Sequence, residues 1–440
     1  MTFSHTQILV FGAGKSATVL IDYLKRETRI RNWTLTVADA DHATVVQKLG
    51  TESHTAAVQI DILDTEKRRS LIESADVVIS LMPPALHYHV ALDCLALKKH
   101  LLTASYVDEK IKALASEIAD NGLLFLCEMG LDPGIDHMSA MQLIHHIKSQ
   151  GGRIHTFKSH CGGLVAPESD NNPWHYKISW NPRNVVLAGK AGAVFLKDGK
   201  EQEIAYDQLF HQSGSVEVPS IGSLAYYANR DSLSYIDKYD LQSCTEFIRT
   251  TLRYPDFCKG WAAIVDLQLT DESQTYATDG LSMQDFLRSH IQNHQLSISV
   301  ERLSNDPLIQ HMLVSLGLNS AELLINKGTC SAADILQWRM ESSWILEPHD
   351  KDMIVMLHEI DYELNGQQKS IKSSLVVKGE DHLRTAMAKT VGLPLGIAAI
   401  LIGEKSLTEK GLHIPIIPSI YTPVLTMLEK EGIIFHEVEN

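Results

Sequence analysis

The chain has 440 residues, of which 44% are hydrophobic and 21% charged, a balance typical of globular domains and not of disordered, collagenous or coiled-coil chains. Its formal net charge of -15 repels phosphate backbones and anionic headgroups, so nucleic acids and membrane surfaces are not expected partners. The scattered cysteines include no CxxC pair and the N-terminus shows no basic head followed by a cleavable apolar run, so we expect a cytoplasmic protein. The longest uncharged apolar stretch, 391–403, contains Pro394 and is shorter than the roughly 20 residues that a bilayer requires, so no membrane-spanning segment is expected.

The N-terminal segment predicts a dinucleotide-binding turn. An apolar run at 7–11 leads into a glycine-rich turn, and 18–26 carries apolar residues at helical spacing. In such a turn the first glycine allows a tight bend, the second lets the backbone approach a pyrophosphate, and a small residue lets the helix pack closely. The alternative is a strand-to-helix turn that binds nothing. The cofactor contacts expected here are Gly12, Gly14, Lys15, Ser16 and Ala17.

Asp39 ends the second expected strand, at 34–38. A carboxylate at this place accepts hydrogen bonds from the adenosine ribose and repels a 2′-phosphate. Residues 40–42 offer no arginine that could hold such a phosphate, so the sequence favours NAD over NADP. The alternative is that Asp39 caps a helix that begins near His42.

Strands and helices continue to alternate, with further strands expected at 57–60, 77–80, 100–104 and 123–127. This alternation predicts a Rossmann-type α/β domain with a parallel sheet, whose strands all end at one edge. Residues that follow these strands should therefore meet where a nicotinamide would lie. The residues assigned there to cofactor or substrate are Asp61, Ser80, Leu81, Pro83, Ser105, Tyr106 and Asp132.

The pattern changes after about residue 150. Strand-like runs at 153–160, 176–180, 185–188 and 193–196 predict a second α/β domain with a mixed or antiparallel sheet. Residues 283–344 turn helical, which predicts a small helical insertion. The helical runs expected in it are 308–316, 321–324 and 332–340.

The C-terminal part predicts a hairpin and two helices. Runs at 353–364 and 367–378 are joined by Asn365-Gly366, the strongest short hairpin signal. Helices follow at 382–402 and 422–431, the latter with Thr422 as cap and Pro423 at its first position. The expected domains are a nucleotide domain at 1–150 completed by about 382–440, a substrate and dimerisation domain at 151–282 and 345–381, and the helical subdomain at 283–344.

Motifs outside the glycine turn are long enough to identify a family. They are Ser80-Leu81-Met82-Pro83, Ser105-Tyr106, Gly130-Leu131-Asp132-Pro133-Gly134-Ile135-Asp136-His137, Cys161-Gly162-Gly163-Leu164, Asn172-Pro173 with Tyr176-Lys177, Asn229-Arg230-Asp231-Ser232 and Thr251-Leu252-Arg253-Tyr254. They resemble the L-glutamate-forming saccharopine dehydrogenases, also called saccharopine reductases, and the match runs from the first strand nearly to the C-terminus.

The resemblance implies an NAD(P)-dependent oxidoreductase of lysine metabolism, built of three domains and forming a homodimer. Its reaction would convert saccharopine to 2-aminoadipate 6-semialdehyde and L-glutamate, or the reverse. One difference bears on the cofactor: the fungal members carry an arginine-containing segment after strand two and use NADP, whereas this chain has Asp39. This difference favours NAD and the catabolic direction.

Oxidation of a secondary amine requires several proton transfers, since the amine must be neutral before hydride leaves and the imine must then take up water. By resemblance, Tyr106, Asp132 and Cys161 line the site and assist these transfers, with Asp132 as the proton acceptor. Each has a structural alternative. Asp132 could form a turn before Pro133 or cap a helix at Asp136, Tyr106 could be a packed aromatic residue, and Cys161 a small buried thiol.

A substrate with three carboxylates needs local cations in so acidic a chain. Arg230 and Arg253 are the candidates, because a guanidinium holds a carboxylate through two parallel hydrogen bonds. The alternative is that each pairs with a neighbouring acid such as Asp231 or Asp256 at the surface.

Metal binding is not expected, although the chain has 21 histidines. His87, His89 and Cys94 lie close in sequence, as do His160 and Cys161, but neither group has a known zinc spacing. His87 either touches the nicotinamide end of a dinucleotide or lies on a helix face. Two other functions stay open: a dehydrogenase of another secondary amine such as carboxynorspermidine, and a regulator that senses NAD without turnover.

Overall fold

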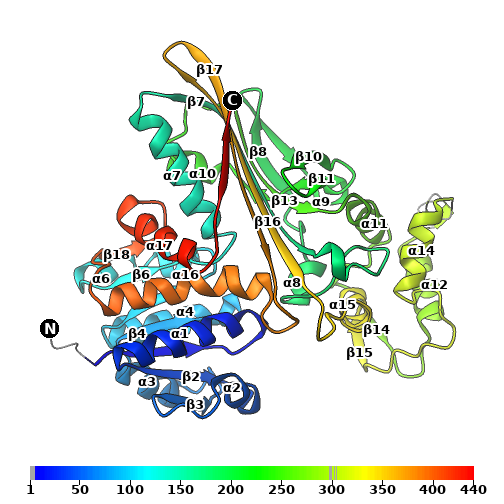
Figure 1. The fold of residues 1–440 in the computed structure, drawn as a ribbon. Helices are drawn as coiled ribbons and strands as arrows, with labels where there is room; N and C mark the ends of the chain where they lie inside the picture. The colour runs from blue at the N-terminus through cyan, green and yellow to red at the C-terminus, as the bar shows by residue number, and fades with distance from the viewer. Residues whose placement is uncertain (1–4, 297–299, 302, 304) are drawn as a thin grey trace. The chain divides into compact units, whose positions relative to one another are not determined.

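The computed structural model describes residues 5–296, 300, 301, 303 and 305–440, and these divide into two compact units (Figure 1). Unit 1 comprises Met1–Gly152 and Leu383–Phe435, and unit 2 comprises Arg153–His382 and His436–Asn440. The last five residues were expected in the nucleotide domain. They lie in unit 2 instead, because the final strand pairs with a strand of the second sheet.

Unit 1 contains a parallel sheet in the order β18-β6-β5-β4-β1-β2-β3. Its strands are β1 Gln7–Phe11, β2 Thr34–Asp39, β3 Thr55–Gln59, β4 Val77–Ser80, β5 His100–Thr103, β6 Leu124–Leu126 and β18 Gly411–His413. Neighbouring strands pair in parallel, which confirms the Rossmann-type sheet, while β18 was not foreseen. The carboxyl ends of β1, β4, β5 and β6 therefore meet at one edge.

Helices connect these strands and complete unit 1. They are η1 Lys15–Ala17, α1 Thr18–Arg31, α2 His42–Leu49, α3 Thr65–Ser74, α4 Pro84–Ala96, α5 Glu109–Lys112, α6 Ala115–Asp120, α7 Ile135–Ser149, α16 Ala386–Gly403 and α17 Pro418–Lys430. Helix α17 begins before the expected Thr422, because Pro418 occupies its first turn and Pro423 lies inside the helix. The starting position predicted for this helix was therefore wrong.

Helix α16 packs along α1, beside which it lies in Figure 1. Gly392 permits this approach, since a Cβ there would lie 2.9 Å from the Cβ of Leu20. By length and hydropathy α16 could cross a bilayer, but 83% of it is buried inside the protein, as expected of a core helix. Burial thus accounts for its apolar composition.

Unit 2 contains a mixed sheet in the order β10-β11-β13-β7-β16-β17-β19, with β8, β9 and β12 attached beside β13. Its strands are β7 Arg153–Val165, β8 Ala193–Lys197, β9 Lys200–Ile204, β10 Gly214–Val218, β11 Gly222–Ala228, β12 Arg230–Asp231, β13 Glu246–Arg253, β16 Asp352–Leu364, β17 Gln367–Lys378 and β19 His436–Glu439. Asn365 (φ 53°) and Gly366 (φ 75°) join β16 to β17, which confirms the predicted hairpin.

Three runs in unit 2 were assigned wrongly. Residues 176–180 form no strand, because their apolar side chains enter the core and the Ile178 amide bonds to the Trp344 carbonyl. Residues 185–188 overlap helix α8 Pro182–Val186, which Asn181 caps. Residues 321–324 form a bend and not a helix. The remaining elements are η2 Pro167–Ser169, α9 Tyr206–Leu209, α10 Ser234–Lys238, α11 Pro255–Asp266, α12 Met283–Asn293, α14 Pro307–Ser315, α15 Ala332–Ser343 and a small sheet of β14 Thr275–Ala277 with β15 Thr329–Ser331.

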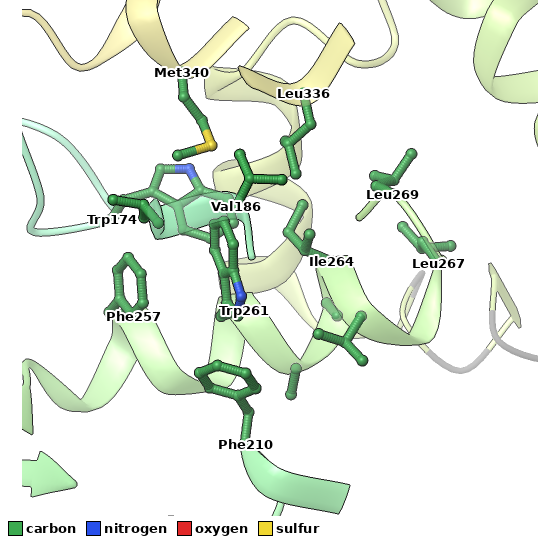
Figure 2. Close-up of a cluster of buried hydrophobic side chains, with 14 of the residues drawn as sticks. Trp174, Val186, Phe210, Phe257, Trp261, Ile264, Leu267, Leu269, Leu336 and Met340 are labelled. Carbon is green, nitrogen blue, oxygen red and sulfur yellow. The ribbon is translucent and has the colours of Figure 1, made fainter. Parts of the chain in front are cut away.

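An aromatic core holds unit 2 together. Figure 2 shows Trp174, Phe257 and Trp261 packed with Met340 and Leu336 from α15. The rings of Phe257 and Trp261 are stacked, with centroids 5.4 Å apart. The helical segment expected as a separate subdomain shares this cluster of buried side chains with the rest of the unit.

Candidate active site

The glycine turn after β1 has the geometry that a pyrophosphate requires. Gly12 adopts φ 103°, and a Cβ there would lie 2.8 Å from the Leu81 carbonyl oxygen. A Cβ at Gly14 would meet nothing within 4 Å, and no side chain caps the helical turn that begins at Lys15. Exposed backbone and uncapped amides at a helix start suit an anion. The turn therefore fits a dinucleotide.

Asp39 is tied to this turn by its own side chain. Its Oδ2 accepts from the Ala13 amide at 2.7 Å and its Oδ1 from the Asp41 amide at 2.9 Å. Asp41, and not Asp39, caps α2, through the Thr44 amide. The helix-cap alternative for Asp39 is therefore wrong, and its carboxylate fixes the glycine turn against the end of β2.

Lys48 is a residue that sequence reasoning missed. Its Nζ donates to the Gly14 carbonyl at 2.7 Å, which places an ammonium beside the glycine turn. Burial lowers the pKa of Lys48, while Asp39 and Asp22 act to raise it. The only signal in the sequence was a lysine in the helix after strand two, which is too common to be specific.

The ends of β4 and β5 are joined through His87. Its Nδ1 lies 2.8 Å from Ser80 Oγ and its Nε2 2.8 Å from Ser105 Oγ. Burial lowers the pKa of His87 to about 4, so the imidazole is neutral at pH 7 and one ring nitrogen donates while the other accepts. His87 thus braces two predicted site residues.

The other predicted cofactor residues lie at the same strand ends. The Leu81 amide donates to the Phe11 carbonyl at 2.8 Å, next to the glycine turn. Pro83 is the N-cap of α4. Asp61 is exposed and accepts from the Leu63 amide at 2.9 Å, as a turn residue does. Lys15 is exposed and Ser16 half-buried.

Tyr106 and Asp132 meet, as the strand order predicted. The Tyr106 hydroxyl donates to Asp132 Oδ1 at 3.5 Å, across 26 residues of sequence, and both side chains are half-buried. A bond of this length is weak, and catalytic bonds of this kind tighten when substrate binds. Helix α7 is capped at Gly134 and not at Asp132, so the helix-cap alternative for Asp132 is wrong.

Glu128 and His137 form a buried pair in the same region. His137 Nε2 lies 2.8 Å from Glu128 Oε2, and both side chains are almost fully buried. The sequence contained a signal for them, because Glu128 directly follows the strand run 123–127 and His137 ends the glycine motif. They were not assigned a function.

In unit 2, Cys161 lies on β7 opposite Thr251 of β13. The next residue must be glycine, since a Cβ at Gly162 would lie 2.4 Å from the Leu252 carbonyl oxygen. The Cys161 thiol is buried. Two strands therefore approach closely where Cys161 and Arg253 were predicted to act.

Arg253 is a buried cation in an aromatic setting. Its guanidinium lies 5.4 Å from the Tyr176 ring centroid and 5.3 Å from that of Phe257, and the residue is 4% exposed. Its Nη1 donates to the Leu252 carbonyl at 2.8 Å, but within the described part of the chain Nε has no hydrogen-bond partner and no acid forms an ion pair with the guanidinium. The predicted alternative of a surface bridge is therefore wrong for Arg253.

Arg230 differs from Arg253 in exposure. It lies on β12 with φ 46°, it is exposed, and it lines a cavity of about 320 Å³ with Lys190, Tyr206 and Glu203. The structure does not bring Arg230 into the aromatic setting of Arg253. Its role in substrate binding stays a prediction.

Metal ligands do not gather in the described ranges: there, no group of three or more His, Cys, Asp or Glu side chains is arranged to hold an ion. His160, one of the histidines considered from the sequence, lies instead 2.6 Å from Thr250 Oγ1 and 3.3 Å from Glu359 Oε2.

Known proteins resemble this chain along its whole length. Residues 8–126 match the family model described as saccharopine dehydrogenase NADP binding domain, and residues 130–433 match the saccharopine dehydrogenase C-terminal domain. The Saccharomyces cerevisiae saccharopine dehydrogenase [NADP(+), L-glutamate-forming] is 31% identical, covering 98% of both chains. A solved apo structure from that yeast superposes with a TM-score of 0.87 at 29% identity, covering 99% of this chain and 100% of the other.

Longer relatives match over part of their length. The alpha-aminoadipic semialdehyde synthases of Arabidopsis thaliana and Rattus norvegicus are 31% and 33% identical over 97% and 98% of this chain, but over only 44% and 47% of their own. The chain therefore spans about half the length of these curated relatives.

The comparisons overturn the predicted preference for NAD. The matched N-terminal model is an NADP-binding domain, and the full-length fungal relatives are named for NADP(+). The physical reason is the role of Asp39. Its carboxylate oxygens accept from the Ala13 and Asp41 amides, so an acid at this position stabilises the glycine turn and does not by itself indicate whether the bound adenosine ribose carries a 2′-phosphate. With both domains matched in order, this chain belongs to the saccharopine dehydrogenase family.

Proposed function

We propose that this protein oxidises saccharopine with NADP and water to 2-aminoadipate 6-semialdehyde and L-glutamate, or catalyses the reverse condensation, in lysine metabolism. The observation that carries the proposal is the Tyr106–Asp132 contact at the carboxyl edge of a parallel sheet that also presents a glycine turn. The full-length yeast relative and its structure support this assignment. They do not favour the two alternatives considered from the sequence.

NADP, when bound, supplies the acceptor for the hydride of the substrate carbon next to nitrogen. Asp132 accepts a proton from the protonated secondary amine, and the neutral amine then has the free nitrogen lone pair that drives hydride departure. The Tyr106 hydroxyl, hydrogen-bonded to Asp132, keeps that carboxylate oriented. Water then adds to the protonated imine and loses one proton to solvent. The Asp132 carboxyl group gives its proton to the nitrogen, and its carboxylate takes the hydroxyl proton as the C–N bond breaks and releases the aldehyde and glutamate. Cys161 is proposed to assist proton transfer.

Arg253 is proposed to bind a substrate carboxylate. Its Nε has no hydrogen-bond partner and no acid in the described residues forms an ion pair with it, so the guanidinium has unused hydrogen-bonding capacity. A carboxylate that bonds it in two places would compensate for burying the charge. Arg230 is proposed as a second carboxylate ligand from its exposed place on β12.

The decisive test is the absorbance of reduced nicotinamide in purified protein given saccharopine and NADP. Appearance of NADPH together with equimolar glutamate supports the proposal. No change with saccharopine, but turnover with another secondary amine, contradicts the substrate. A higher kcat/KM with NAD than with NADP contradicts the cofactor. The homodimer stays a prediction, which a molar mass measured by light scattering would test.

A further inference from the structure

Glu128 is a buried acid for which the proposed mechanism has no use. It is 2% exposed and lies two residues after β6, with its backbone in the left-handed region at φ 57°. Few non-glycine residues adopt that conformation, and those that do often lie at functional sites. A buried carboxylate also costs free energy unless it is hydrogen-bonded, so its partners indicate what it is for.

One set of partners lies on both sides of Tyr106. Glu128 Oε1 accepts from the Val107 amide at 3.3 Å, and the Glu128 amide donates to the Ser105 carbonyl at 3.0 Å. The backbone before and after Tyr106 is therefore bonded to a single residue. The next amide along, that of Met129, donates to the Thr103 carbonyl at 3.1 Å and continues the attachment.

The other set of partners belongs to the segment that carries Asp132. Glu128 Oε2 lies 2.8 Å from Nε2 of His137, which stands in the first turn of α7. That turn follows directly on Asp132, and the Asp136 amide donates back to the Leu131 carbonyl at 3.0 Å. Glu128 thus connects the loop of Tyr106 to the helix that begins beside Asp132.

We propose that Glu128 is a positioning residue, which holds the Tyr106 hydroxyl at its distance from Asp132. The inference rests on the proposed function, because only a reaction that uses this pair makes the distance matter for turnover. Release of the loop would displace the hydroxyl, and a displacement of about 1 Å at a reacting group can cost about 100-fold in rate. Glu128 acts by accepting hydrogen bonds and takes no proton from substrate.

Two substitutions separate positioning from proton transfer. Glu128→Ala removes both acceptors and should lower kcat by about 10- to 100-fold, with KM for NADP changed by less than about threefold. Glu128→Gln keeps an amide oxygen that accepts from the Val107 amide, so it should restore kcat to within about threefold of wild type. A folded Glu128→Gln protein whose kcat is more than about 10-fold below that of wild type would overturn the proposal. This criterion compares Glu128→Gln with wild type, so it applies even if Glu128→Ala fails to fold.

A double-mutant cycle tests whether Glu128 acts through Tyr106. In a Tyr106→Phe background, Glu128→Ala should cost less than about threefold in kcat, since the hydroxyl it positions is gone. Equal costs in both backgrounds would contradict the proposal. The matched control is Asp93→Asn, a buried acid of helix α4 that pairs with Arg68 at 2.7 Å and with Arg69 at 2.8 Å, both on helix α3. It should lower the melting temperature and leave kcat unchanged.

Amide hydrogen exchange keeps this inference distinct from the proposed function. Exchange at residues 104–108 should rise at least about tenfold in Glu128→Ala and stay unchanged in Asp93→Asn. If wild type does not oxidise saccharopine, the proposed function fails, and unchanged exchange would separately reject the link between Glu128 and the Tyr106 loop.

Discussion

The two units present their polar residues in different ways. In unit 1, Ser80 ends strand β4, and Tyr106 and Asp132 lie in the segments that follow β5 and β6, where neighbouring strand ends come together. In unit 2, Cys161 and Arg253 lie on strands of a mixed sheet. Strand order therefore places the residues of unit 1, whereas packing against aromatic side chains places Arg253.

The difference also shows in how each unit manages a buried polar group. His87 in unit 1 is neutral and has a partner for each ring nitrogen. Arg253 in unit 2 stays charged, since nearby tyrosines and thiols raise its pKa against the opposing effect of burial. The two ring nitrogens of His87 are both paired, whereas the buried guanidinium of Arg253 keeps an unbonded Nε that an anion could accept from.

The largest effect should come from Asp132. Asp132→Ala is expected to lower kcat by about two to four powers of ten, because it removes the proposed proton acceptor. NADPH formation with saccharopine measures this. Near-normal turnover with a lower melting temperature would instead assign Asp132 to the turn alone, and strand order would then no longer predict chemistry in unit 1.

A smaller effect is expected at Arg253. Arg253→Lys should raise KM for saccharopine by about 10- to 100-fold, because one charge-assisted hydrogen bond contributes about 1.5 to 3 kcal/mol. KM for NADP should not change. Arg339→Lys is the control, because Arg339 lies 5.2 Å from the Trp338 ring and donates to the Leu316 carbonyl without a proposed ligand. If the two variants had the same KM for saccharopine, Arg253 would not bind a substrate carboxylate.

A further prediction concerns stability and pH, with no effect on the chemistry of the site assigned to it. Burial lowers the pKa of His87 to about 4 from 6.5, so the unfolded chain binds a proton in this range that the folded chain does not. The stability due to neutral His87 is full above pH 6.5 and falls by on the order of 3 kcal/mol towards pH 4. His87→Leu should flatten this dependence in urea unfolding.

Glu359 in unit 2 provides the counterpart. A hydrogen bond from His160, with a further one from Lys372, lowers its pKa to about 2 from 4.5 against desolvation. Its contribution is present above pH 4.5 and is lost as the pH falls towards 2, so Glu359→Gln should flatten only that lower range. If His87→Leu and Glu359→Gln changed stability over the same pH range, the pKa values of His87 and Glu359 would not be those assigned here.

The sequence predicted much of unit 1 because its signals are local. Apolar runs alternating with helical spacing imply parallel strands, and the chain connectivity then brings Tyr106 and Asp132 to one edge. Asn365-Gly366 likewise predicted the hairpin of unit 2 from backbone preference alone. The run 176–180 was misassigned, because alternating apolar residues there enter an aromatic core instead of pairing with a strand.

What the sequence by itself determined is the order of the first six strands of unit 1, the hairpin of β16 and β17, and the family, since these follow from periodicity, glycine conformation and motif. Only the tertiary structure decided the partners: Asp39 bonds the glycine turn, Arg253 is buried without an ion-paired acid among the described residues, and Glu128 joins the Tyr106 loop to helix α7. Such contacts join residues far apart in the chain, and whether a polar group meets water, an amide or an aromatic ring depends on packing that no local pattern records.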